Sequence, residues 1–140
     1  RHLLDGLDAR IAGTRFVLGA PGEADLVTGI AAGRSNTVPV HDLPLDEVMA
    51  LIADCAFFVG NDSGLLNLAA ALGVAAIGLF GATPPLTHMT RLTAILPPGG
   101  RFSRTDGMAR ITPDQVLGAL DPMVRTTSSS PAVLNDACWR

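Results

Sequence analysis

A long apolar segment at residues 57–81, FFVGNDSGLLNLAAALGVAAIGLFG, constrains the fold more than any other part of the sequence. Residues 56–59 and 74–80, at its two ends, are short apolar runs without alternation, which is typical of strands buried on both faces. Between them, residues 65–72 have the pattern of a helix, and Gly73 can end it. A strand, a helix and a second strand in this order predict a βαβ unit of a parallel sheet.

Helical and strand patterns alternate along most of the chain. Apolar residues at helical spacing, bounded by Gly or Pro, predict further helices over residues 2–12, 23–32, 44–53 and 112–120. Short apolar runs predict further strands over residues 16–18, 38–40 and 92–96. We therefore expect an α/β fold, a Rossmann-like parallel sheet with helices on both faces. No periodicity follows residue 125, so residues 126–140 are predicted to be a flexible tail.

The composition restricts the classes of partner. Of the 140 residues, 48% are hydrophobic and 16% are charged, which is more apolar than a typical soluble domain. Either the sheet is covered on both faces, or something outside this chain covers part of its surface. The net charge of −3 argues against nucleic acid as a partner. Residues 65–81 are too short and too rich in glycine for a membrane-spanning helix, so no transmembrane segment is predicted.

Two further features bear on the origin and surroundings of the chain. The two cysteines have neither the spacing of a disulfide framework nor that of metal ligands. We interpret Cys55 as a buried thiol and Cys138 as incidental, which fits a reducing compartment. The sequence has no signal-peptide pattern and does not begin with Met, so we expect a piece of a longer protein in the cytoplasm.

A short polar run that suits a ligand loop breaks the apolar segment at Asn61, Asp62, Ser63 and Gly64. In an open parallel sheet, ligands bind beyond the carboxyl ends of the strands, where loops lead into helix N-termini. The N–H groups there favour an anion, Ser63 adds a hydroxyl, and Gly64 lets the backbone come close to a ligand. Asp62 does not suit an anion, but it suits a helix cap or a sugar hydroxyl beside a phosphate. On the residues alone, a ligand loop and a plain helix cap stay equally open.

The polar run and its flanks resemble a known family. Residues 57–85, FFVGNDSGLLNLAAALGVAAIGLFGATPP, resemble the signature segment of glycosyltransferase family 9, the heptosyltransferases of bacterial lipopolysaccharide synthesis. Weaker similarities follow the family's order in RFVLGAPGEADLV, LPLDEVMALIADC and ITPDQVLGAL, so the resemblance spans residues 2–120. It implies the GT-B architecture, in which two Rossmann-like halves face a cleft. Residues 1–125 would be a partial C-terminal half, which binds the nucleotide-sugar donor, with its first strand missing.

The resemblance also implies roles for individual residues. Glu23 would contact the donor ribose, although the helix dipole alone also favours a Glu in a first helical turn. Asp62 would lie near the donor sugar, while Ser63 and Gly64 would meet the diphosphate. Thr83 would border the same cleft, or be an ordinary turn residue. The predicted substrate-binding residues are Glu23, Asn61, Asp62, Ser63, Gly64, Asn67 and Thr83.

The sequence departs from the family pattern at Asn67, where the family has a histidine. A histidine near a diphosphate can carry positive charge, whereas an amide donates a hydrogen bond without charge. This difference allows a different donor or a site without activity. No residue of this chain fills the role of the catalytic base, which in the family lies in an N-terminal, acceptor-binding half. No metal is implied, because the sequence has no cluster of metal ligands and the resemblance is to enzymes that use a helix dipole and side chains in place of a cation. No cofactor is implied either, because the nucleotide sugar is itself a substrate.

The predicted function is the donor-binding part of an inverting glycosyltransferase. It would move a heptose-like sugar from a nucleoside diphosphate to a glycan or lipopolysaccharide-type acceptor, in the cytoplasm or at the periphery of the inner membrane. This chain alone is predicted to be inactive, to need the missing half as a partner, and to self-associate through surface which that half would cover. One alternative is a non-catalytic binding or assembly module of the same fold. Another is an unrelated nucleotide-binding domain, although Gly19 and Gly22 lack the full Gly-x-Gly-x-x-Gly pattern of nicotinamide enzymes.

Overall fold

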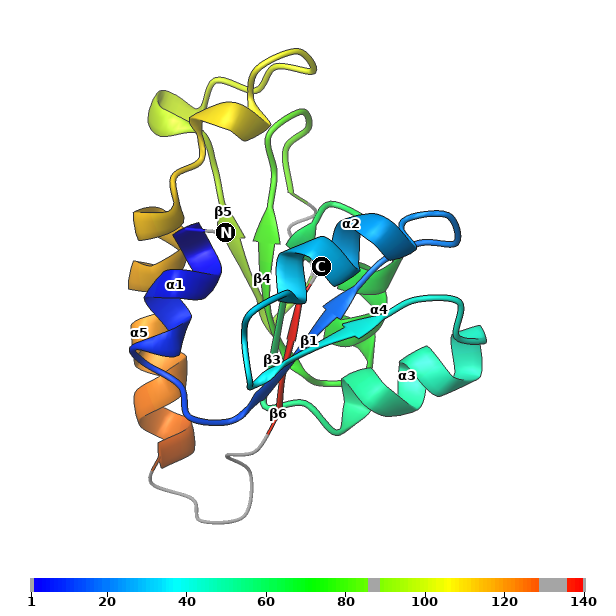
Figure 1. Ribbon diagram of the computed structural model, residues 1–140. Helices are drawn as coiled ribbons and strands as arrows, with labels where there is room; N and C mark the ends of the chain where they lie inside the picture. Colours follow the sequence, from blue (N-terminus) through cyan, green and yellow to red (C-terminus); the bar gives the residue numbers. More distant parts are fainter. Residues whose placement is uncertain (1, 86–88, 129–135, 140) are drawn as a thin grey trace.

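The computed structural model of the chain describes residues 2–85, 89–128 and 136–139. It is a six-stranded sheet with helices on both of its faces (Figure 1). Every pair of neighbouring strands is parallel. The predicted α/β fold with a Rossmann-like parallel sheet is therefore confirmed.

The elements follow one another much as the apolar patterns predict. The helices are α1 (His2–Asp8), α2 (Ala24–Ala31), α3 (Leu45–Ala53), α4 (Gly64–Ala71) and α5 (Pro113–Ser128). The strands are β1 (Thr14–Leu18), β2 (Thr37–Val40), β3 (Phe57–Asn61), β4 (Ala75–Leu79), β5 (Leu92–Ile95) and β6 (Asp136–Trp139). Two short 3₁₀ turns, Pro98–Gly100 and Met108–Arg110, lie between β5 and α5.

Local sequence explains where several of these elements begin and end. Gly73 has a φ of +80°, a conformation that favours glycine, and this residue ends the turn that follows α4. A reciprocal capping box starts α5: the Thr112 N–H donates to Oε1 of Gln115 at 2.8 Å, and the Gln115 N–H donates to Oγ1 of Thr112 at 3.3 Å. Pro113 then occupies the first helical position, where a missing N–H does no harm.

The order of the strands in the sheet is β2-β1-β6-β3-β4-β5, so the last strand in the chain takes a central place. Phe16 and Phe58 both lie opposite Cys138 in the parallel register. In a doubly wound sheet of order 3-2-1-4-5-6, this place belongs to the first strand. The first strand that we expected to be missing thus corresponds to the position that β6 fills.

The prediction of a flexible tail from residue 126 is wrong where the structure describes that segment. Residues 126–128 continue α5, and residues 136–139 form β6. A four-residue central strand is too short to show a periodic pattern, and its place is set by the two strands beside it. Residues 129–135 and 140 lie outside the described part of the chain.

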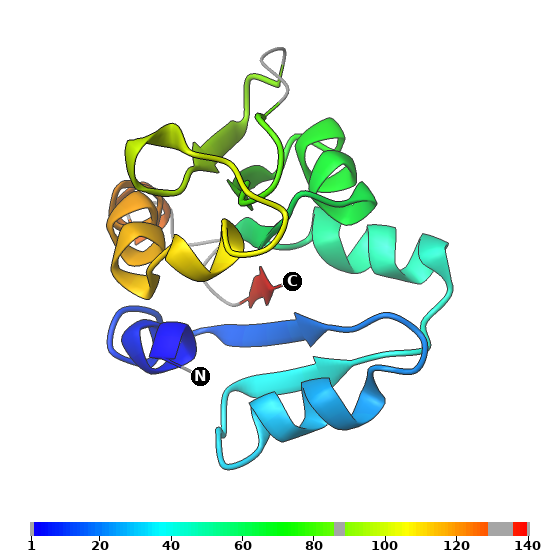
Figure 2. The same ribbon diagram turned by 90° about the horizontal axis from the view of Figure 1, so that it is seen from above.

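The core consists of two apolar clusters, one on each face of the sheet. Figure 2 shows the helices that cover these faces. On one face, α1, α2 and α5 bury Leu7, Val27 and Leu120 against the strands. On the other, α3 and α4 bury Ile52 and Leu66. Strand β3 contributes to both clusters, because successive side chains point to opposite faces. Burial on both faces explains why its sequence is continuously apolar.

Two predictions about the surroundings of the chain can be compared with the structure. Cys55 is buried as expected, but its sulfur is disulfide-bonded and is not the reduced thiol that we predicted. Within the described residues, no helix combines the length and the apolar character needed to cross a bilayer.

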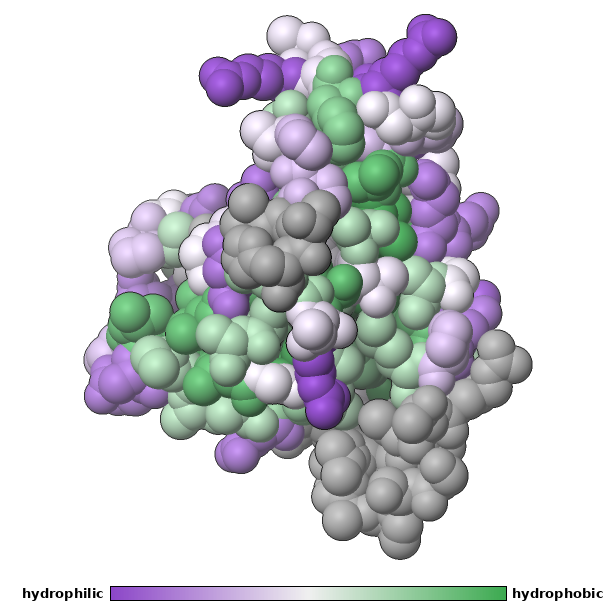
Figure 3. All heavy atoms as spheres, turned by 180° about the vertical axis from the view of Figure 1, so that it is seen from behind, coloured by the Kyte–Doolittle hydropathy of each residue, from purple (hydrophilic) through white to green (hydrophobic). Residues whose placement is uncertain are grey.

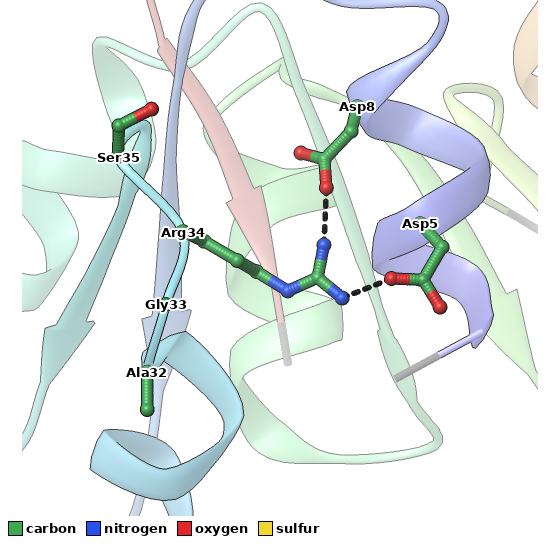
Figure 4. A pocket seen from close by; sticks show the side chains of 6 residues that line it. All are labelled: Asp5, Asp8, Ala32, Gly33, Arg34 and Ser35. Carbon is green, nitrogen blue, oxygen red and sulfur yellow. Dashed lines mark hydrogen bonds and ion pairs between the residues drawn. The ribbon is translucent and has the colours of Figure 1, made fainter.

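An ionic cluster ties α1 to the amino edge of the sheet (Figure 4). The guanidinium of Arg34, which follows α2, points between Asp5 and Asp8 of α1 and pairs with both carboxylates. Arg15 in β1 is only 2% exposed, and it pairs with Asp8 as well. The hydrogen bond from Arg34 lowers the pKa of the Asp5 carboxyl group. The pocket of about 350 Å³ beside these residues is therefore lined by charges that already have partners.

Replacing Asp8 with Ala is expected to destabilise the protein strongly, because the buried Arg15 loses the partner of its charge. We expect the free energy of unfolding to fall by about 2–3 kcal/mol, below the range for a fully buried pair because Asp8 is itself partly exposed. Urea unfolding followed by circular dichroism measures it. Asp5→Ala is the matched control: Asp5 is exposed and pairs with Arg34, so a much smaller loss is expected. Equal losses for the two variants would contradict the role given to Arg15.

Candidate functional site

The polar run lies at the carboxyl edge of the sheet, where β3 turns into α4. Asn61 is the last residue of β3, and Ser63 is the N-cap of α4 with extended backbone angles. Between them, the N–H of Asp62 donates to the carbonyl oxygen of Leu79 at 3.2 Å, so its backbone is still attached to the end of β4. The turn from strand to helix is therefore short and held on both sides.

Ser63 acts as a helix cap, as one of the two sequence interpretations required. Its hydroxyl oxygen accepts a hydrogen bond from the N–H of Leu66 at 3.5 Å. The first N–H groups of a helix have no partner within the helix, and the cap takes only one of them. Those of Gly64 and Leu65 keep the polarity that attracts an anion. The cap by Ser63 therefore does not exclude binding of an anion at the same helix end.

Gly64 is not required by the fold itself. A Cβ atom added to Gly64 would have no other atom within 4 Å, and the residue does not have a positive φ. A small residue at this helix end leaves the N–H groups open to close approach from outside. This geometry is what the ligand-loop interpretation of Gly64 requires.

Thr83 lies in the loop that follows β4 and contacts the polar run directly. Its hydroxyl donates a hydrogen bond of 2.8 Å to Oδ2 of Asp62. Both residues are exposed, so the contact joins two loops at the surface of the carboxyl edge. Thr83 therefore contacts the polar run, and its predicted place at the border of a ligand cleft stays a prediction.

Asn67 belongs to the same group of residues. It lies in α4 one helical turn after Ser63, and its N–H donates to the carbonyl oxygen of Ser63 at 3.2 Å. Residues separated by three or four positions share a helix face, so Asn67 lies one turn further along the same face as Ser63 and Gly64. Asn67 is half-buried, and its amide can supply donors without a charge.

Glu23 lies in a second loop, apart from this group. Its Oε2 accepts a hydrogen bond of 2.7 Å from the N–H of Ala20, and its own N–H donates to the carbonyl oxygen of Ala20 at 2.9 Å. The carboxylate thus closes the loop between β1 and α2. Strand β6 separates β1 from β3, so the two loops start about 10 Å apart, which is two strand spacings.

The two loops flank the point at which the strand order of the sheet reverses. In the register of the sheet, Trp139 lies opposite both Val17 and Val59, which precede Gly19 and Asn61. Both loops therefore begin beyond the described end of β6. This switch point is where open α/β sheets bind their ligands.

A glycine contact that the sequence analysis missed fixes the base of the Thr83 loop. The carbonyl oxygen of Gly81 accepts from the N–H of Ser103 at 2.9 Å. A Cβ atom on Gly81 would lie 2.3 Å from the nitrogen of Met108, and one on Gly107 would lie 1.9 Å from the oxygen of Gly81. The two buried glycines thus let the segment after β5 press onto the end of β4, at the top of Figure 1. The sequence feature that could have indicated this contact is a glycine directly after a predicted apolar strand.

Several hydrophilic side chains project near this edge. Seen from behind, strongly hydrophilic side chains project from the top of the molecule, where the segment between β5 and α5 lies, whereas apolar residues gather lower down (Figure 3). The helix end at Gly64 suits an anion, and the exposed Asp62 carboxylate suits a neutral hydroxyl donor. In the part of the chain that the structure describes, no three His, Cys, Asp or Glu side chains are placed to hold a metal ion.

Comparison with known proteins identifies a family that this chain matches. Residues 4–94 match glycosyltransferase family 9 (heptosyltransferase). The chain is 34% identical over 92 residues to lipopolysaccharide heptosyltransferase 2 of Escherichia coli K12, covering 57% of this chain and 26% of the relative. It is 33% identical over 96 residues to lipooligosaccharide heptosyltransferase 2 of Haemophilus ducreyi, covering 57% and 27%. The chain thus spans about a quarter of the length of these curated relatives.

Solved structures show the same fold. The E. coli ADP-heptose lps heptosyltransferase II superposes with a TM-score of 0.74 at 23% identity, covering 91% of this chain and 40% of that chain. E. coli heptosyltransferase WaaC with ADP-2-deoxy-2-fluoro heptose gives a TM-score of 0.68 at 22% identity, covering 86% and 37%. These structures cover most of this chain, and the family match includes the polar run between β3 and α4. On that match, the chain belongs to glycosyltransferase family 9.

Proposed function

We propose that this chain is the nucleotide-sugar-binding part of an inverting glycosyltransferase. The full protein would move a heptose-like sugar from a nucleoside diphosphate to a glycan or lipopolysaccharide-type acceptor, in the cytoplasm or at the periphery of the inner membrane. The observation that carries the proposal is the polar run at the N-terminus of α4, at the switch point of a sheet whose sequence matches the family. Related solved proteins carry ADP-heptose or ADP in their names, which supports an ADP-type donor.

Each part of the site would act on a different part of the donor. The diphosphate would lie against the N-terminus of α4, where the N–H groups of Gly64 and Leu65 and the Ser63 hydroxyl stabilise the leaving negative charge. Asn67 would add an uncharged donor. Asp62 would accept a hydrogen bond from a sugar hydroxyl, and Glu23 would face the ribose from the loop that it closes with Ala20.

The acceptor and the catalytic base would come from the rest of the protein. In an inverting displacement, a carboxylate removes the proton of the acceptor hydroxyl, whose oxygen attacks the anomeric carbon while the nucleoside diphosphate leaves. We place no residue of this chain in the role of the base, so the chain alone is proposed to be inactive. The donor is a substrate, and no separate cofactor is proposed.

A second candidate is a non-catalytic binding module of the same fold. The observation that favours it is Asn67, whose amide cannot carry the positive charge of the family histidine. Such a module would bind the nucleotide without turnover. A transfer assay on the full-length protein separates the two candidates, since only an enzyme releases the nucleoside diphosphate in step with acceptor glycosylation.

Nucleotide binding tests the proposal directly. Calorimetric titration of the chain with ADP, UDP, GDP and NAD is expected to show selective binding of a nucleoside diphosphate. Ser63→Ala and Gly64→Ala are each expected to weaken it by on the order of tenfold, the first by removing a hydroxyl and the second by placing a methyl group where the phosphate approaches. Ser63→Ala also removes a cap and costs about 1 kcal/mol of stability.

Gly64→Ala separates binding from folding. Its Cβ atom meets open space, so the thermal midpoint of unfolding should not fall. Gly118→Ala is the matched control, because Gly118 is another exposed helical glycine with open space around its Cβ position and lies on α5, away from the polar run. This control should leave nucleotide affinity unchanged. No binding of any nucleoside diphosphate by the wild-type chain, or a preference for NAD, would overturn the proposal.

A further inference from the structure

We propose that Thr83 is a positioning residue, which holds the carboxylate of Asp62 ready for a hydroxyl group of the sugar carried by the bound nucleotide. The inference rests on the proposed function and deepens it, because it assigns recognition of the sugar to a contact between two loops. The observation behind it is the hydrogen bond of 2.8 Å from the Thr83 hydroxyl to Oδ2 of Asp62.

The backbone of Asp62 is held in place without help from Thr83. Its N–H donates to the carbonyl oxygen of Leu79, and the next residue, Ser63, caps α4. The side chain is in a different situation, because it is exposed and an exposed carboxylate samples several rotamers. The contact with Thr83 selects one of them. Thr83 therefore acts on the direction of the carboxylate and not on the path of the chain.

Thr83 is itself attached to a firm base. Gly81, which shortly precedes it, is buried against Gly107 and accepts a hydrogen bond from the N–H of Ser103. The segment after β5 thus fixes the start of the loop that carries the Thr83 hydroxyl. A donor two residues after this fixed start can orient a carboxylate on another element.

The two ends of the polar run differ in charge, so they favour different chemical groups of a ligand. The helix end at Gly64 attracts the negative diphosphate, whereas the Asp62 carboxylate repels it. Oδ2 of Asp62 already accepts from Thr83, and the second carboxylate oxygen can accept from a further donor. Neutral sugar hydroxyls are donors of this kind. Loss of the Thr83 hydroxyl should therefore weaken binding of the sugar and spare that of the nucleotide.

The test compares ADP with ADP-linked heptose in calorimetric titrations of the full chain. Thr83→Val removes the hydroxyl and keeps the shape, and it is expected to weaken binding of ADP-heptose by on the order of tenfold while leaving ADP affinity unchanged. Thr83→Ser keeps the hydroxyl and should restore wild-type affinity for both. The thermal midpoint should be the same in all three proteins, because both partners of the hydrogen bond are exposed.

The outcomes distinguish this inference from the function on which it rests. If the wild-type chain binds neither ligand, the proposed function fails and the inference falls with it. If the wild type binds both, and Thr83→Val weakens neither or weakens both equally, the positioning role is overturned while nucleotide binding stands. Selective loss of ADP-heptose binding in Thr83→Val, with rescue by Thr83→Ser, is the result that supports the role.

Discussion

A chain that ends at residue 135 is expected to lose cooperative unfolding, because it lacks the strand at the centre of the sheet. Strand β6 is the only described link by strand pairing between β1 and β3. Without it, the sheet divides into β2-β1 and β3-β4-β5, with a gap of about 10 Å and two unpaired edges. A domain of this size has roughly 5–15 kcal/mol of stability to lose. Thermal unfolding followed by circular dichroism, together with size-exclusion chromatography, measures the loss.

Proline substitutions in β6 test the same strand without shortening the chain. Ala137→Pro removes a backbone donor from a strand that has neighbours on both sides, and it is expected to cost about 3 kcal/mol or more. Asp136→Pro is the matched control, since proline is tolerated at the first residue of a strand. A truncated chain that unfolds at the wild-type temperature would mean that β1 and β3 hold together without β6.

The position of β6 also shows where sequence reasoning ends. The strands β3 and β4 and the helix between them could be predicted, because burial on both faces demands continuous apolar runs and a helix between parallel strands. Strand β6 could not be predicted, because its place in the sheet depends on the positions of the two strands beside it. The start of β1 was also missed, because the buried charge of Arg15 interrupts the apolar pattern and is compensated by Asp8 on another element.

The candidate site, too, could be predicted from the sequence only in part. The polar run of Asn61, Asp62, Ser63 and Gly64 was predictable, because polar residues and glycine inside an apolar segment need a reason, and Ser63 does cap α4. The contact between Asp62 and Thr83 was not, because it depends on β3 and β4 ending side by side. The functional roles of these residues, with Asn67 and Glu23, remain predictions that ligand binding must test.

Gly107→Ala is expected to be among the most destabilising single substitutions in this chain. The new Cβ atom would lie 1.9 Å from the carbonyl oxygen of Gly81 and 2.5 Å from that of Ser103, and both are backbone atoms. A backbone neighbour cannot rotate away, so the segment after β5 must lift from the end of β4. We expect the free energy of unfolding to fall by about 3 kcal/mol, the upper end for overpacking of a buried site. Urea unfolding measures this change.

Gly118→Ala gives the contrast that assigns the effect to packing. Gly118 lies on the exposed side of α5 with open space around its Cβ position, so alanine should stabilise the helix by about 0.5–1 kcal/mol. The sign of the change thus reverses between two glycines of the same chain. A lifted segment would also release Gly81 and the loop that carries Thr83, so Gly107→Ala should lose affinity for ADP-heptose as Thr83→Val does. Wild-type stability in Gly107→Ala would mean that the segment after β5 does not press on β4. The proposal that this segment fixes the start of the Thr83 loop would then be wrong.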